Sequence, residues 1–126
     1  KAFRGILQPV ALKFQPELVL LSAGFDSYFQ DPLGDMRVTP KGYVYMMRIL
    51  LDITAACCGG RLVAVLEGGY NVEGLTESVK LVLREMRGDT RASEDDLYRM
   101  EYEAEQGKDQ ILRRVTEQIN PVWQVF

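Results

Sequence analysis

Apolar residues along this chain fall into two kinds of pattern, short continuous runs and longer runs with helical spacing. One continuous run starts at Leu18 and breaks at Gly24, and another follows Arg61 and ends at Gly68 and Gly69. Such runs, bounded by turn residues, are typical of strands that are buried on both faces. The segment between them is long enough for a crossover connection, so we expect the two strands to be parallel.

An amphipathic helix is predicted near each end of the chain. Residues 1–14 have apolar positions at helical spacing, which predicts a helix that rests on the sheet, with Pro9 as the point of a kink. We expect this helix to end at Gln15, because the residue before a proline avoids the helical region. Residues 111–119 regain helical spacing, and Pro121 is expected to stop that second helix.

Two further helices are predicted around the second strand. One begins with Thr39 as N-cap and Pro40 as its first residue, and it closes at Gly59 as a left-handed cap. The other begins after Asn71, which is well placed as its N-cap, and runs to Met86. The apolar stripe of the first of these helices is predicted to be Tyr43, Met46, Met47, Leu50 and Ile53, and its exposed face is marked by Lys41, Arg48 and Asp52.

These patterns predict one α/β domain, residues 1–126, in which helices flank a few strands. Residues 88–110 are polar and charged, so they predict a surface loop followed by a weak helix. Residues 111–126 predict a C-terminal helix and a tail that docks through Trp123 and Phe126.

Composition narrows the class of protein. The 126 residues are 47% hydrophobic and 26% charged, as expected for one soluble globular domain. A net charge of −3 without a basic stripe argues against nucleic-acid binding. No apolar run is long enough for a membrane span or a signal peptide, so we expect a cytoplasmic protein. The two cysteines, Cys57 and Cys58, are adjacent, which disfavours a disulfide.

Candidate chemistry lies just past each predicted strand. Asp26 and Asp31 follow the first strand, and Tyr70 and Asn71 follow the second. Because parallel strands open at one edge, Asp26 and Tyr70 should share one rim, where ligands of α/β proteins usually bind. Two structural alternatives stay open: the aspartates bracket a tight turn, and Asn71 serves only as an N-cap.

Several ordered motifs carry a resemblance to a known family. The chain contains, in order, SAGFD, four further residues, DPLG, VTPKGY and later LEGGYN. This series of motifs resembles the C-terminal part of the zinc-dependent histone deacetylase superfamily, which includes acetylpolyamine amidohydrolases and acetoin-utilisation proteins. The resemblance extends from about Phe3 to Met86. It implies part of a three-layer, parallel-sheet fold of the arginase and deacetylase type.

The resemblance also implies roles for individual residues. Asp26 matches an aspartate that binds the catalytic zinc, and Tyr70 matches a tyrosine that polarises the substrate carbonyl. Leu33 matches a wall of the acyl-lysine channel, while Gly68 and Gly69 let the backbone approach the site. The implied substrate is an acetylated lysine or an acetylated polyamine.

The chain departs from that family because it contains no histidine. It therefore lacks the zinc histidine and the proton-handling histidines, which lie upstream in the family, and one carboxylate cannot hold a catalytic zinc ion. We expect a C-terminal fragment or a truncated relative that is inactive alone. The alternatives are an oligomeric structural or interaction protein, and a small domain that binds phosphate at the Gly68–Gly69 turn and the Asn71 helix start. Unpaired strand edges lead us to expect a homo-oligomer.

Overall fold

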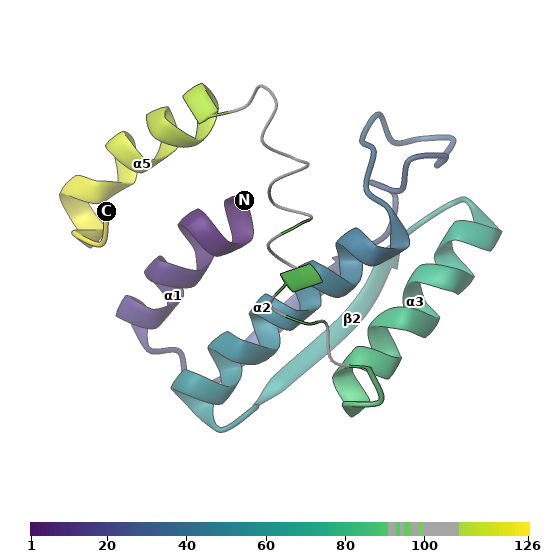
Figure 1. Ribbon diagram of the computed structural model, residues 1–126, viewed down its shortest axis with the longest axis horizontal. Helices are drawn as coiled ribbons and strands as arrows, with labels where there is room; N and C mark the ends of the chain where they lie inside the picture. Colours follow the sequence, from purple (N-terminus) through teal and green to yellow (C-terminus); the bar gives the residue numbers. More distant parts are fainter. Residues whose placement is uncertain (91–92, 94, 97–98, 100–108) are drawn as a thin grey trace.

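The computed structural model describes residues 1–90, 93, 95–96, 99 and 109–126. Its sheet consists of β1 (Val19–Gly24) and β2 (Leu62–Gly68), which pair in parallel as predicted. The register runs from Val19 opposite Leu62 to Ala23 opposite Leu66, and an irregularity then brings Gly24 opposite Gly68. Helix α2 (Pro40–Cys58) makes the crossover between the strands (Figure 1).

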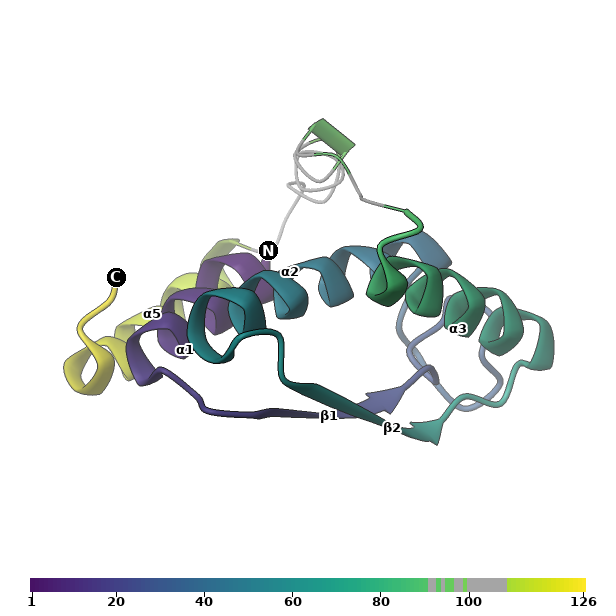
Figure 2. The ribbon, with the colours of Figure 1, turned by 90° about the horizontal axis from the view of Figure 1, so that it is seen from below.

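Helices α2 and α3 (Val72–Arg87) lie side by side and cover one face of the sheet (Figure 2). The core contains two clusters of buried side chains. The first cluster comprises Phe25, Tyr28, Tyr43, Met47 and Val82, and the second comprises Tyr45, Ile49, Leu50 and Ile53. Burial of these apolar side chains is the main stabilising term of such a layer pair.

The other face of the sheet is not covered by the described residues (Figure 2). Leu20 and Val65 on this face are 72% and 58% exposed. The prediction of strands buried on both faces is therefore wrong for this chain by itself. The continuous apolar runs predict strands that are covered on both faces, but the described residues supply a helical layer on one face of the sheet only.

Local signals set the boundaries of α2 and α3 as predicted. Thr39 caps α2 by accepting a hydrogen bond from the Gly42 backbone N–H at 3.2 Å. Gly59 closes the helix with a left-handed φ of 61°. Two buried residues, Tyr45 and Ile49, lie outside the predicted stripe because Phe3 and Ala11 of the N-terminal helix pack against that side of α2.

The N-terminal helix begins as a π-helical stretch, Phe3–Leu7, and continues as α1 (Gln8–Phe14). The wider turn lies directly before Pro9, which lacks a backbone donor. This helix packs chiefly against α2 rather than on the sheet, which corrects the prediction. It ends at Gln15 as predicted, with a left-handed φ of 57°.

The C-terminal helix α5 (Asp109–Trp123) continues through Pro121, so the prediction that proline stops it is wrong. The helix ends after Trp123, where the Asn120 side chain accepts hydrogen bonds from the backbone N–H groups of Val125 and Phe126. Trp123 makes an edge-to-face ring contact with Phe14 of α1. The predicted loop and weak helix at 88–110 fall mostly outside the described residues. Within the described ranges, no helix combines the length and apolar character needed to cross a membrane.

Candidate functional site

The carboxyl ends of β1 and β2 meet at one rim, as the sequence predicts. The backbone N–H of Phe25 donates to the carbonyl oxygen of Gly68 at 2.8 Å, which extends the pairing one step past the strands. Asp26 follows immediately on one side and Tyr70 on the other, so the two predicted site residues come from adjacent strand ends.

Glycines surround the Asp26 side chain and leave space for it. A Cβ atom at Gly68 would lie 3.0 Å from Asp26 Oδ2, and one at Gly24 would lie 3.3 Å from Oδ1. At Gly34 a Cβ atom would collide with the backbone carbonyl of Asp26. Larger residues at these positions would push the carboxylate or its backbone aside. The Asp26 side chain itself is exposed and can therefore reach a ligand.

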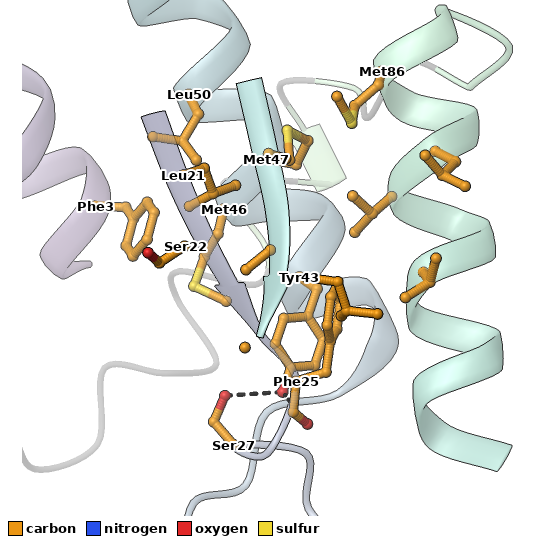
Figure 3. Close-up of a pocket in the computed structure, with 17 residues that line it drawn as sticks. Phe3, Leu21, Ser22, Phe25, Ser27, Tyr43, Met46, Met47, Leu50 and Met86 are labelled. Carbon is orange, nitrogen blue, oxygen red and sulfur yellow. Dashed lines mark hydrogen bonds between the residues drawn. The ribbon is translucent and has the colours of Figure 1, made fainter. Parts of the chain in front are cut away.

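Tyr43 of α2 fixes the backbone on both sides of Asp26 (Figure 3). Its phenol donates to the carbonyl oxygen of Phe25 at 3.0 Å and shares a hydrogen bond with Ser27 Oγ at 2.8 Å. The rings of Tyr43 and Phe25 pack with their centroids 4.8 Å apart. Burial, together with the negative charges of Asp26 and Asp31, raises the pKa of the Tyr43 phenol. The phenol therefore stays protonated and keeps its donor.

Asp31 is buried, with 8% of its surface exposed, and joins the two halves of the rim. Its Oδ1 accepts from the Leu33 backbone N–H at 2.9 Å and so closes a tight turn that starts at Asp31. Its Oδ2 accepts from the N–H groups of Tyr70 at 2.7 Å and Asn71 at 3.2 Å. Burial opposes the charge, but backbone donors, Tyr70 first among them, outweigh it and hold the pKa of Asp31 below its usual 3.8. These long-range bonds give Asp31 a place at the rim that sequence reasoning missed.

The other residues predicted for the site, Tyr70, Leu33, Gly69 and Asn71, lie in the two segments that the Asp31 carboxylate joins. Tyr70 and Leu33 are 56% and 72% exposed, so both side chains are accessible from solvent. Gly69 has a φ of 130°, and a Cβ there would lie 3.0 Å from the Phe25 Cβ. Asn71 caps α3, since its side chain accepts from the Gly74 N–H at 2.8 Å, and its amide also donates to the Gln30 carbonyl at 3.0 Å.

The described residues do not form a complete metal site. Within them, no group of three or more histidine, cysteine, aspartate or glutamate side chains is placed to hold a metal ion. Catalytic zinc normally takes three protein ligands. Asp26 can therefore supply one oxygen ligand of such a site, and the described residues by themselves do not supply the full set of ligands for a zinc ion.

An apolar cavity of about 330 Å³ lies between the sheet and the covering helices (Figure 3). Its walls include Leu21, Tyr43, Met46, Met47 and Met86. Neither Asp26 nor Tyr70 lines it, but Gly24, Phe25 and Ser27 do, so the cavity reaches the backbone on both sides of Asp26.

Comparisons with known proteins agree with the motifs. The model of the histone deacetylase domain matches residues 1–86. Polyamine deacetylase HDAC10 of Mus musculus is 48% identical over 88 residues, which are 70% of this chain and 13% of that protein. Histone deacetylase 15 of Arabidopsis thaliana is 40% identical over 93 residues, which are 74% of this chain and 16% of that protein. This chain therefore spans less than a fifth of the length of these curated relatives.

A solved structure shares the arrangement of the chain. The crystal structure of the HDA15 HD domain matches with a TM-score of 0.74 and 34% identity. The match covers 98% of this chain and 30% of that one. Both the sequence and the fold therefore correspond to a portion of a larger domain.

Proposed function

This chain belongs to the histone deacetylase family, and we propose that it supplies the C-terminal part of a zinc-dependent amide hydrolase site, to be completed by residues outside these 126. The observation that carries the proposal is the shared rim. Asp26 and Tyr70 follow adjacent parallel strands that the Phe25–Gly68 hydrogen bond holds together at 2.8 Å. A metal ligand and an oxyanion donor must lie close together to act on one carbonyl group.

Each rim residue has a role in this proposal. Asp26 offers its exposed carboxylate as one ligand of the zinc ion, which when bound supplies Lewis-acid chemistry. The exposed Tyr70 phenol donates a hydrogen bond to the oxygen that gains charge as the amide is attacked. Leu33 offers an apolar wall for the alkyl part of an acetylated lysine or polyamine. Gly68 and Gly69 allow the substrate to approach the backbone.

Phosphate binding at the Gly68–Gly69 turn is not proposed. The N–H groups of Tyr70 and Asn71 already donate to the Asp31 carboxylate, and that of Gly74 donates to the Asn71 side chain. A phosphate there would also meet the negative charge of Asp31. The open apolar face of the sheet instead favours, as a second candidate, an interaction or oligomerisation role for the isolated chain.

The test uses a complete domain in which residues 1–86 of this chain replace the matching segment of the HDA15 HD domain. Asp26→Ala should lose zinc together with turnover of an acetyl-lysine substrate. Tyr70→Phe should keep its zinc and lose about 10²-fold in kcat, as expected for one oxyanion donor. Asp35→Asn, which changes an exposed carboxylate in the same loop, is the control.

Two outcomes would contradict the proposal. One is full zinc content and turnover in Asp26→Ala, and the other is equal zinc loss in Asp26→Ala and Tyr70→Phe. The isolated chain, which has no histidine, should show no chelator-sensitive turnover and only weak zinc binding.

A further inference from the structure

We propose that Asp31 is a positioning residue whose single buried carboxylate holds Leu33 and Tyr70 in fixed relation to each other. The inference rests on the proposed function, because that function gives Leu33 and Tyr70 their roles. Asp31 itself need not touch the substrate. It would act through the two residues that do.

The hydrogen bonds of Asp31 divide between the two sides of the rim. Oδ1 accepts from the Leu33 N–H at 2.9 Å, within the loop that follows β1. Oδ2 accepts from Tyr70 at 2.7 Å and Asn71 at 3.2 Å, in the turn between β2 and α3. A shift of either segment would lengthen bonds to the same carboxylate, so the two segments can only move together while the bonds persist.

The loop that carries Asp31 is itself anchored. The N–H of Asp31 donates to the Tyr28 carbonyl at 2.9 Å, and the N–H of Phe29 donates to Val38 at 3.0 Å. The Tyr28 ring packs against Gly74 so closely that a Cβ at Gly74 would collide with it. Asp31 therefore projects from a fixed base rather than from a free loop tip.

A charged acceptor is required for this arrangement. The Oδ2 atom receives two N–H donors, which an ionised carboxylate accepts well. The amide of an asparagine in the same place cannot satisfy all three donors, because its nitrogen carries hydrogens of its own. Asp31→Asn thus leaves one side of the rim without its acceptor, whichever way the amide turns, and so breaks the link between the two sides while it keeps the size and shape of the side chain.

Positioning and simple structural support predict different kinetics. If Asp31 acts on kcat through the Tyr70 phenol, its loss should lower kcat only while that phenol is present. A shift of Leu33, which offers a wall for substrate binding, should change KM instead. In the chimeric domain described above, Asp31→Asn should lower kcat about 10-fold, because a donor displaced by a fraction of an ångström loses much of its effect. Zinc content should be unchanged.

The double variant is the sharpest readout. Asp31→Asn combined with Tyr70→Phe should have no lower kcat than Tyr70→Phe alone, since residues that act as a unit are not additive. Losses that multiply, or an Asp31→Asn rate equal to that of the Asp35→Asn control, would overturn the inference. An inactive unmutated chimera, or full activity in Tyr70→Phe, would instead count against the proposed function.

Amide exchange in the 126-residue chain tests the tether without any activity. The Tyr70 and Asn71 amides of the unmutated chain should exchange at least about 10-fold more slowly than free peptide amides, because they are hydrogen-bonded. Asp31→Ala, which removes both oxygens, should remove this protection, and Asp35→Asn should keep it. Exchange at the free-peptide rate in the unmutated chain, or protection that survives in Asp31→Ala, would show that the carboxylate does not hold the turn.

Discussion

Tyr43 is a core residue that also forms hydrogen bonds to residues at the rim. Helical spacing predicts that Tyr43 is buried, and the structure confirms it. The position of the phenol has a second consequence, because its hydrogen bonds to Phe25 and Ser27 fix the backbone next to Asp26. The same side chain therefore fills the core and orients the candidate metal ligand.

Replacement of Tyr43 with phenylalanine should separate these two roles. The ring would remain, but the Phe25 carbonyl would keep only one of its two donors, the Tyr28 N–H at 3.1 Å, and Ser27 Oγ would lose its bond to the phenol, at a cost of about 1 kcal/mol in the free energy of unfolding. Urea denaturation of the chain measures the change. Tyr70→Phe, which removes a phenol from an exposed side chain, is the matched control and should cost less than about 0.5 kcal/mol. Equal stability of the two variants would contradict the role of the Tyr43 hydroxyl.

The depressed pKa of Asp31 gives a pH-dependent prediction. Because the folded-state pKa lies below the usual 3.8, the carboxylate stabilises the fold at every pH above that value. This contribution is lost as the pH falls through the folded-state pKa. The difference in unfolding free energy between the unmutated chain and Asp31→Asn should therefore be constant from about pH 7 to 5 and shrink as the pH falls below the usual 3.8.

Thermal unfolding across this pH range provides the measurement. Asp35→Asn serves as the control for the loss of one negative charge in the same loop. A difference between the unmutated chain and Asp31→Asn that grows on acidification would have the wrong sign for a carboxylate held by backbone donors.

At the scale of elements, an ion pair joins α2 to α3. Arg48 Nε lies 2.6 Å from Glu85 Oε1, and the Glu85 side chain is fully buried. Thr90 also donates to Glu85, at 3.0 Å. The sequence pattern assigned Arg48 to the exposed face of α2, and this is wrong, because α3 packs over that position.

Loss of Glu85 should therefore be costly. Glu85→Ala would leave the Arg48 guanidinium without its buried partner, and we expect a loss of about 3 kcal/mol in unfolding free energy. Asp52→Ala removes a more exposed partner of the same arginine, 3.6 Å away, and should cost less than about 1 kcal/mol. Denaturant titration compares the two. Similar losses in both variants would show that the buried pair does not join the helices.

The success of the sequence predictions depends on how far apart the interacting residues lie. Caps such as Thr39, Gly59 and Asn71 act within one helical turn, and each was found as predicted. The parallel strands followed from the apolar runs and the length of the crossover. The bonds of Asp31 to Tyr70 span 39 positions and depend on the packed structure, so no local pattern could predict them. The shared rim was predictable, and the carboxylate that joins its two sides was not.

At the scale of the whole molecule, the described residues form two layers of the three-layer fold that the family resemblance implies. One face of the sheet packs against α2 and α3, and the other face is open (Figure 2). The C-terminal helix does not cover this face through Trp123, whose ring contact is with Phe14 of α1. The match to 30% of the HDA15 domain is consistent with a sheet whose other layer lies outside these residues.

An isolated chain with this open face should form a homo-oligomer. Both strands have an outer edge without a paired strand among the described residues, and Leu20 and Val65 present apolar surface beside them. Association with an identical copy would bury this surface, most often through a two-fold axis. Light scattering at micromolar concentration should then give a mass that is a multiple of the 14.3 kDa of one chain.

A pair of lysine substitutions identifies the surface responsible. Val65→Lys should shift the chain towards monomer, because a buried ammonium group opposes association. Val72→Lys changes a more exposed valine, at the start of α3, and should leave the mass unchanged. A mass near 14.3 kDa for the unmutated chain that does not change on dilution would rule out the oligomer. An oligomer that Val65→Lys leaves intact would place its interface away from the sheet.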